Sequence, residues 1–436
     1  MRKFLLLMTI FCAAVTAAQN FSVCPSLQKH VGYLCSDSLK GRAPGSQGER
    51  LAAEYLYNAL SAASVEMLTD INGQDFTISE VSGDFHSCNI VGIVEGSDDK
   101  LKDEYIVVGA NIDAPGVNRM TIDGVPSEQL FAGADANASG VAIMVELARL
   151  AVENSWLFPR SIVFVGFGAG EKGSAGAWYF ANRAFGQMEN VKAMVDLDML
   201  GHCSNAARFQ VLSQVPPADL DYLLSLVSDE PVVSLPQVAK SSYVTSDYIP
   251  FYEKEIPFFY FSTGKGREYH TVKDVPSSLS YADMELECNY LFYFLKTLSS
   301  LDDIPAVHSS PESSKPAHDV VYSFSQCDRR PQFFHSDERH FLKAWVYKYL
   351  KYPESAIQDG TQGTVVVGFT IEKNGEVTDV HVENGVDERL DAEAVRVISV
   401  SPKWIPGQIS GSKVRTRISV PVEFRLRKSN QFGIKK

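Results

Sequence analysis

GADANASGVAIMVELARLA, which spans Gly133–Ala151, joins a loop of small residues directly to an apolar segment with helical periodicity. α/β enzymes commonly place their chemistry on such loops, because a glycine-rich backbone can approach a ligand closely and a helix N-terminus favours anions. The middle of this loop is Ala136, whose side chain provides no acid, base or metal ligand. The stretch therefore predicts the frame of an active site that lacks one of its working groups.

Short apolar runs rich in β-branched residues lie on both sides of this segment. They are bounded by turn residues, which is typical of strands buried in a helix-covered sheet. The runs are Cys88–Val94, Tyr105–Ala110, Ser161–Phe167, Val191–Leu197 and Ile256–Ser262. Helical patterns at Val141–Val152 and Ala175–Phe185 alternate with them. This order predicts an α/β fold, a three-layer sandwich around a mixed, largely parallel sheet.

Ligands of such folds bind beyond the carboxyl ends of the strands. We therefore expect the loops after Ala110, Phe167, Leu197 and Ser262 to converge on one site.

The composition changes after a helix that ends near Leu301. Residues 302–335 are rich in Pro and Ser and predict a linker. Residues 336–427 then predict a small α+β domain, followed by a tail at 428–436. The predicted elements of this small domain are a helix at Phe341–Tyr352, strands at Thr364–Glu372 and Val377–Glu383 joined by an Asn-Gly turn, a helix at Leu390–Val400 and a strand at Val414–Leu426.

The N-terminus has the layout of a secretory signal peptide. Arg2 and Lys3 precede an apolar run, Phe4–Ala18, that ends in small residues. We predict cleavage after Ala18, a first domain at 19–301 and a periplasmic or otherwise exported protein. An uncleaved membrane anchor is the alternative. Six cysteines remain after cleavage, and both disulfides and buried free thiols stay open for them.

The charge distribution bears on the kind of partner. The formal net charge of the 436-residue chain is −13, and the excess of acidic residues lies before Ser336. An acidic body of this size argues against a nucleic-acid surface, and we expect no nucleic-acid partner.

Residues from about Cys24 to Leu298 resemble the zinc aminopeptidases of the family that includes aminopeptidase Y, glutamate carboxypeptidase and glutaminyl cyclase. The resemblance rests on many blocks in the family's order. The blocks are LKGRAPGS, CNIVGIVEGS, DEYIVVGANIDAPG, GADANASG, RSIVFVGFGAGEKGSAGA, VDLDMLG, SDYIPFYEKEIPFFYFSTG and YHTVKD. The resemblance implies a metallopeptidase-like domain with a site for two zinc ions.

Members of that family hold the metals through two His, two Asp and one Glu, with a second Glu as general base. Carried over by position, three of these functions are lost and three metal ligands remain. The lost positions are Asn111 for a ligand His, Ala136 for the bridging Asp and Gly170 for the general base. The remaining ligand positions are Glu171, Asp198 and His270. Asp113 matches a carboxylate that orients the lost His; alternatively, it satisfies loop amides.

These losses can be weighed by coordination. A catalytic zinc takes three protein ligands and keeps one open position, and without the bridging carboxylate neither subsite reaches three. Asp135 lies one residue from the bridging position, and on a short turn its side chain points elsewhere. We therefore expect no cofactor, or at most one zinc at Glu171, Asp198 and His270. The domain is expected to be a pseudoenzyme, with no confident catalytic residue.

Residues from about Phe341 to Leu426 resemble the C-terminal domain of TonB. The resemblance rests on YPESAIQDGTQGTVVVGFTIEKNGEVTDVHV, LDAEAVRV, SPKWIPG and VRTRISVPVEFRL. It implies a Gram-negative envelope and contact with an outer-membrane receptor or another envelope protein, in part by addition of a strand to the sheet edge. A dedicated membrane helix and a long Pro-rich spacer are missing, so an interaction module is favoured over an energy transducer.

The sequence as a whole predicts an exported, aminopeptidase-like protein with a degraded two-zinc site, whose cleft holds a peptide or an amino-acid derivative and whose TonB-like domain docks it. Two alternatives remain. One is a divergent aminopeptidase or cyclase that uses a single metal, and the other is a TonB-like energy-transducing or receptor-interacting protein.

Overall fold

The computed structural model describes residues 20–80, 83–122, 125–202, 209–232, 234–239, 244–306, 321–333, 338–409 and 411–426. The predicted signal peptide, the tail at 428–436 and Cys203 lie outside these residues. Cys24, Cys35, Cys88, Cys288 and Cys327 are free thiols. Within the described ranges, no helix combines the length and the apolar composition needed to cross a membrane.

A mixed sheet forms the middle of the first domain, in the order β1-β3-β7-β4-β8-β11-β9-β10, with β2 paired to β3. Strands β4, β7, β8 and β11 run parallel to one another, and β3 and β9 pair antiparallel with β7 and β11. The strands are β1 (Glu66–Met67), β2 (Gln74–Glu80), β3 (Gly83–Val94), β4 (Tyr105–Asn111), β7 (Ser161–Phe167), β8 (Val191–Leu197), β9 (Gln210–Ser213), β10 (Gln237–Val238) and β11 (Phe258–Ser262).

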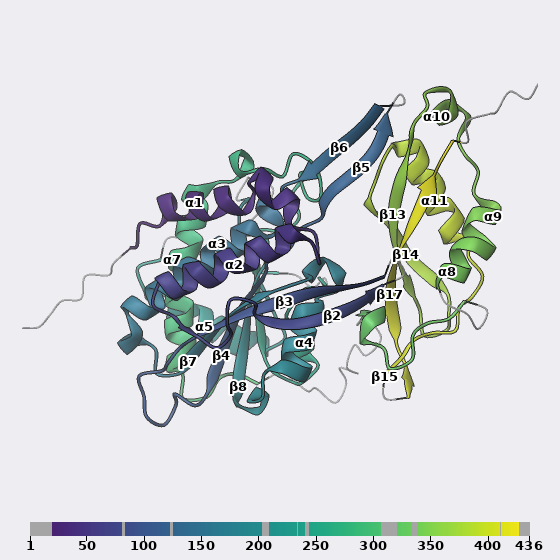
Figure 1. Cartoon of the computed structure of the whole chain (residues 1–436). Helices are drawn as coiled ribbons and strands as arrows, with labels where there is room; N and C mark the ends of the chain where they lie inside the picture. The colour runs from purple at the N-terminus through teal and green to yellow at the C-terminus, as the bar shows by residue number, and fades with distance from the viewer. Residues whose placement is uncertain are drawn as a thin grey trace, which may run out of the picture.

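Helices cover both faces of this sheet and make the three predicted layers (Figure 1). One face packs against α1 (Cys24–Leu34), α2 (Gln47–Ala62), α3 (Ser139–Glu153), α5 (Pro217–Ser228) and α7 (Tyr281–Ser300). The other face packs against α4 (Ala175–Tyr179) and α6 (Ile249–Tyr252). The α/β prediction is confirmed, and the predicted helix at Ala175–Phe185 continues from α4 as a π-helical turn, Phe180–Ala184.

The second domain is a smaller α+β unit. Its sheet joins β13 (Gln362–Ile371) to β14 (Val377–Asn384) on one side and to β17 (Arg415–Phe424) on the other. The alternating residues Val365, Val367, Phe369 and Ile371 are fully buried in its core. The helices are α8 (Glu338–Phe341), α9 (Tyr347–Tyr349), α10 (Glu354–Gln358) and α11 (Glu388–Ser399), and β15 (Gln408–Ile409) pairs with β16 (Ser412–Lys413).

Two further segments join this second sheet. Strand β12 (Val321–Ser323), from within the predicted linker, pairs parallel with β17, and Phe333 is buried in the second core. The hairpin β5 (Gly116–Ile122) and β6 (Val125–Phe131) leaves the first domain and reaches the second sheet (Figure 1). There β5 pairs with the first residues of β13, which β14 does not cover.

The side chain of Arg42 ties the loops of the first domain together. It is fully buried, and its guanidinium donates to the carbonyls of Ile112, Ala132 and Gly133 over 2.8–3.0 Å and to that of Leu34. These carbonyls belong to the end of α1, the loop after β4 and the loop before α3. Since buried carbonyls need donors, one side chain holds the end of this helix and the two loop segments together.

We predict that Arg42→Met lowers the free energy of unfolding by about 4 kcal/mol, because it leaves buried carbonyls without donors. Chemical denaturation followed by circular dichroism measures this loss. Arg50→Met, at an exposed position of α2, is the matched control and should change stability by less than about 0.5 kcal/mol. Equal stability of the two variants would contradict the assignment.

Candidate functional site

The loops at the carboxyl ends of β4, β7, β8 and β11 meet as predicted. They enclose a small cavity of about 90 Å³ whose lining includes both the replaced and the surviving positions. The residues that line it from these loops and from the turn before α3 include Asn111, Ala136, Asn137, Gly170, Glu171, Ser174, Asp198, Met199, Lys265 and Tyr269. His270 lies beside this cavity, in contact with Glu171. The chain thus gathers the positions that the sequence singled out.

Glu171 and His270 pair with each other. The distance between Glu171 Oε1 and His270 Nε2 is 3.1 Å. Burial alone would raise the pKa of Glu171, but the charge and hydrogen bond of His270 outweigh it and hold that pKa below its usual value. Burial lowers the pKa of His270, and the carboxylate of Glu171 raises it by more. The two side chains therefore stabilise each other as an ion pair.

Asp198 has a different set of neighbours. The hydroxyl of Tyr260 donates to its Oδ2 over 2.9 Å. Burial raises the pKa of Asp198 to about 6, against the effects of this hydrogen bond and of the charge of Lys265. Lys265 also lowers the pKa of Glu171, and its ammonium lies 4.4 Å from the centre of the Tyr269 ring. Tyr260 and Lys265 were missed by the sequence analysis, because neither is a metal-ligand position of the family motif.

The replaced positions are engaged with one another and with the loop backbone. Asn111 Oδ1 accepts from the amide of Asn137 over 3.0 Å, and Asn111 Nδ2 donates to the carbonyl of Asp113. A Cβ atom on Gly170 would lie 2.5 Å from the Cβ of Asn111. A glutamate therefore fits at position 170 only if Asn111 moves.

Asp135 points away from the cavity. Its carboxylate accepts from His202 Nδ1 and the Gly201 amide, each over 2.7 Å, and from the hydroxyl of Ser139. These contacts fix the loop before α3 to the loop after β8. The carboxylate is thus committed elsewhere and does not replace the one missing at Ala136.

Asp113 is fully buried beneath the loop that carries Glu171. Its carboxylate accepts the backbone N–H groups of Gly170 and Glu171 over 2.7 and 2.9 Å. Burial and the nearby carboxylates of Glu49 and Glu171 raise its pKa. Asp113 therefore shapes the loop from below and makes these contacts without an imidazole to orient.

Zinc coordination can be tested against these donors. Within the described ranges, no group of three or more His, Cys, Asp and Glu side chains is arranged to hold a metal ion. Glu171 and His270 face each other, and Asp198 faces Tyr260. As they stand, these donors fall short of the three protein ligands of a catalytic zinc.

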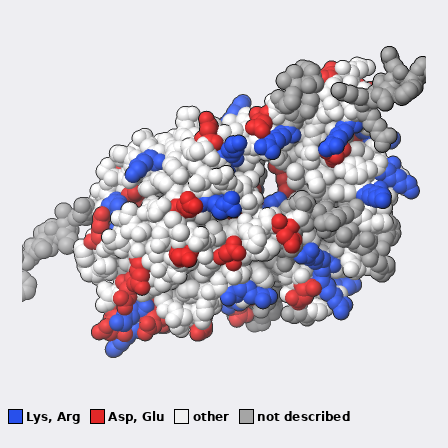
Figure 2. Space-filling model, in the orientation of Figure 1, with Lys and Arg blue, Asp and Glu red and all other residues white. Residues whose placement is uncertain are grey.

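A larger cleft opens between the two domains above Glu171 and His270. Its volume is about 940 Å³, and the second domain contributes β14, the start of α11 and Arg417 to its walls. Figure 2 shows an opening between the domains with charged side chains at its rim. The surviving residues thus face a space that both domains shape.

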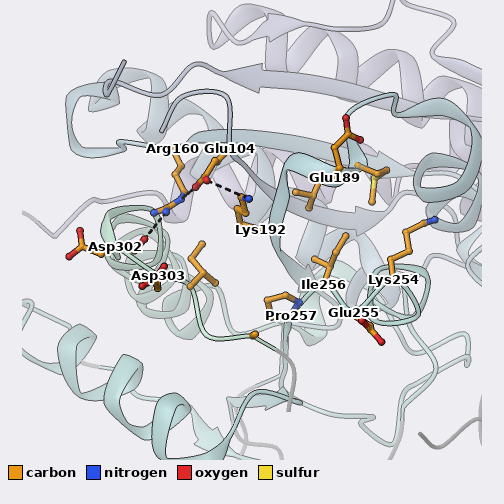
Figure 3. Close-up of a pocket in the computed structure, with 14 residues that line it drawn as sticks. Glu104, Arg160, Glu189, Lys192, Lys254, Glu255, Ile256, Pro257, Asp302 and Asp303 are labelled. Carbon is orange, nitrogen blue, oxygen red and sulfur yellow. Dashed lines mark hydrogen bonds and ion pairs between the residues drawn. The ribbon is translucent and has the colours of Figure 1, made fainter. Parts of the chain in front are cut away.

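A depression at the opposite end of the sheet has a structural role. It lies at the amino ends of the parallel strands, where Glu104 accepts from Arg160 and Lys192 (Figure 3). Arg160 also donates to the carbonyls of Ser299 and Leu301 at the end of α7. The charged side chains of this depression therefore connect the end of α7 to the sheet.

The fold and the arrangement of the loops define a zinc-exopeptidase-like α/β domain joined to a small sheet domain. Residues 89–290 match Peptidase family M28, and residues 348–426 match the Gram-negative bacterial TonB protein C-terminal family. The chain therefore joins a peptidase family M28 domain to a TonB C-terminal domain.

Two individual relatives each match part of this chain. A probable zinc metalloprotease of Pyrenophora tritici-repentis is 35% identical over 114 residues, which are 26% of this chain and 24% of that protein. A TonB protein of Xanthomonas campestris pv. campestris is 37% identical over 79 residues, which are 17% of this chain and 34% of that protein. The chain thus spans about a quarter and a third of these relatives.

Solved structures show the fold of the first domain. The Legionella pneumophila LapA aminopeptidase has a TM-score of 0.51 and 21% identity, covering 64% of this chain and 72% of that one. BSAP, a zinc aminopeptidase from Bacillus subtilis, has a TM-score of 0.51 and 13% identity, covering 63% and 95%.

We predict that Asp113→Ala lowers the free energy of unfolding by about 3 kcal/mol, because two buried N–H groups lose their acceptor. Asp113→Asn keeps one acceptor oxygen and should cost less. Urea denaturation of both variants measures the difference. Asp229→Ala, at an exposed position after α5, is the control. An Asp113→Ala protein as stable as this control would show that the loop does not depend on the carboxylate.

Proposed function

We propose that this chain is an exported pseudoenzyme, a non-catalytic peptide-binding or scaffolding protein of the Gram-negative envelope that docks through its TonB-like domain. One observation carries the proposal. The three replaced positions, Asn111, Ala136 and Gly170, line a single cavity beside the surviving Glu171 and Asp198. Three changes at one centre remove a ligand, the bridge between the metals and the general base together.

The chemistry of the family supports this reading. Two metals activate a shared water, and a base takes its proton and delivers it to the leaving group. With Ala136 and Gly170 in those places, neither the bridge nor the base is present. Glu171 is paired with His270, which leaves the cleft as a binding surface rather than a reacting centre.

Metal content tests the proposal most directly. After dialysis against zinc and then buffer, the purified protein should hold well under one equivalent of zinc, because its remaining donors do not complete a site. Elemental analysis gives the number. Two tightly bound zinc ions, or turnover of aminoacyl anilides that a chelator and Glu171→Ala both abolish, would establish the enzyme instead.

Restoring ligands gives a sharper form of the same test. Asn111→His combined with Ala136→Asp returns a His and the bridging carboxylate beside Asp198, and should raise zinc content to at least one equivalent. Asn72→His, at an exposed turn outside the lining of the cavity, controls for adventitious binding to an added histidine. A restored variant that binds no more zinc than this control would contradict the view that these two losses emptied the site.

The proposed export is tested separately, by the position at which the signal peptide is cleaved. We predict that material recovered from the periplasm of an expressing cell begins at Gln19, because the small residues before it suit signal peptidase. Mass spectrometry of the N-terminal peptide identifies the first residue. A chain that still begins at Met1 and remains with the membrane fraction would support the uncleaved anchor.

A further inference from the structure

One segment of the second domain combines lysines with aromatic residues and contains no acidic residue. Residues 340–352 read HFLKAWVYKYLKY, and they include the end of α8, the π-helical turn Leu342–Val346 and α9. The whole chain carries 53 Asp and Glu against 40 Lys and Arg. A run of this length without a carboxylate therefore differs from the rest of the molecule.

The aromatic side chains of this segment form a surface beside α11. The indole N–H of Trp345 donates to the carbonyl of Val397 over 2.9 Å, and the ring of Tyr349 packs on the indole with 4.5 Å between the ring centres. Tyr347 and Tyr349 expose 46% and 44% of their surface, and Val400, which directly follows α11, exposes 56%. Residues three and four apart are neighbours on a helix, which joins the exposed side chains into one continuous surface. We name it the lysine–aromatic patch, and it consists of Lys343, Trp345, Tyr347, Lys348, Tyr349, Lys351 and Val400.

The patch keeps an excess of positive charge after ion pairs are counted. Its three lysines form no ion pair among the described residues. Two ion pairs at its border are balanced, because Glu393 pairs with Arg396 and Glu423 pairs with Arg425, each over 2.6 Å. Glu354, exposed at the start of α10, offsets one of the lysines. Three lysines against this one carboxylate leave two positive charges.

The patch lies on the outer side of the second domain. Figure 1 shows α8 and α9 on the side of this domain that faces away from the first domain, and Figure 2 shows Lys and Arg side chains along the same edge. The acidic excess of the chain lies before Ser336. Because salt screens charges beyond about 8 Å at physiological ionic strength, that excess has little effect at the patch. A surface bound to the patch also leaves the cleft between the domains open.

These groups fit the headgroup region of an anionic lipid bilayer. Trp and Tyr rings have an apolar body and a polar tip, and Lys side chains have an apolar stem and a charged head, so both suit the boundary between acyl chains and water. Anionic lipids attract basic side chains close to their surface. Protein interfaces are also rich in Trp and Tyr, but they are depleted of Lys. The three unpaired lysines beside the rings therefore favour lipid over a protein partner.

We propose that the second domain binds membrane surfaces that contain anionic phospholipid, and that it does so through the lysine–aromatic patch. The proposal goes beyond the function proposed above and does not depend on what the cleft holds. The lysines draw the domain to the phosphate groups, and the rings of Trp345, Tyr347 and Tyr349 settle at the interface. The binding is reversible, because no long apolar segment of the patch enters the bilayer.

Vesicle sedimentation tests the charge. The chain is used from Gln19 onward, so that the apolar run Phe4–Ala18 makes no contribution. It should sediment with vesicles in which phosphatidylglycerol makes up about a third of the lipid, and it should stay in solution with phosphatidylcholine alone. Lys343→Gln combined with Lys348→Gln should lower the partition coefficient about tenfold at low salt, with a smaller effect at high salt.

A matched variant removes the same charge elsewhere in the domain. Lys403→Gln combined with Lys413→Gln changes two exposed lysines outside the patch and should lower the partition coefficient by less than about threefold. Equal losses in the two double variants would overturn the assignment to the patch. A chain that fails to sediment with the anionic vesicles would overturn lipid binding altogether.

Tryptophan fluorescence tests the position of the rings. Lipids with brominated acyl chains quench an indole that reaches the interface, so binding should quench the emission of the unaltered chain. Trp345→Phe should lose most of this quenching, whereas Trp156→Phe, at an exposed position of the first domain, should keep it. Circular dichroism of both variants checks that the fold is kept.

A soluble acidic polymer distinguishes lipid from a protein partner. If poly-L-glutamate displaces the chain from the vesicles and Trp345 is not quenched by the brominated lipid, the membrane surface is overturned and the patch is a site for an acidic polypeptide. Quenching that depends on Trp345, together with binding that depends on Lys343 and Lys348, supports the membrane surface.

Discussion

The backbone of the loops at the carboxyl ends of the parallel strands is buried, and its polar groups must find partners inside the protein. Arg42 supplies donors to the carbonyls of Ile112 and Gly133 in the long connection after β4, and the buried carboxylates of Asp113 and Asp274 supply acceptors. Asp274 accepts the amides of both Asp135 and Ala136. None of these contacts involves a metal. The frame of the site is therefore held by contacts within the protein, and the proposed loss of metal ligands is compatible with the surrounding fold.

The proposed loss of the metal site would change the electrostatics of the centre as well as its chemistry. Without metal ions, Glu171 and Asp198 would meet in a buried space with no compensating charge, which is costly. Three interactions compensate the negative charge of these carboxylates. Glu171 pairs with His270, Tyr260 donates a hydrogen bond to Asp198, and the charge of Lys265 lowers the pKa of both carboxylates. Glu171, Asp198 and His270 thus have polar partners within the protein.

The sequence predicted elements that have a local pattern, and it missed contacts between residues that lie far apart along the chain. The runs at Ser161–Phe167 and Val191–Leu197 are strands with the predicted bounds, because continuous burial leaves an unbroken apolar signal. The hairpin β5–β6 was missed, because its polar residues resemble a loop and its partner strand lies more than two hundred residues further along the chain. Asn111, Ala136 and Gly170 could be compared with a family pattern position by position. Lys265 and Tyr260 could not, since their importance appears only when the loops are folded together.

The same hairpin connects the domain organisation to the site. By pairing with the start of β13, β5 fixes the second sheet beside the loops that carry Glu171 and His270, and Asn118 adds a side-chain hydrogen bond to the carbonyl of Gly385. That pairing takes up the end of the sheet edge nearest the hairpin and leaves β14 open beside the cleft. The second domain thus forms one wall of the cleft above Glu171 and His270, so any ligand that reaches these residues also meets the second sheet.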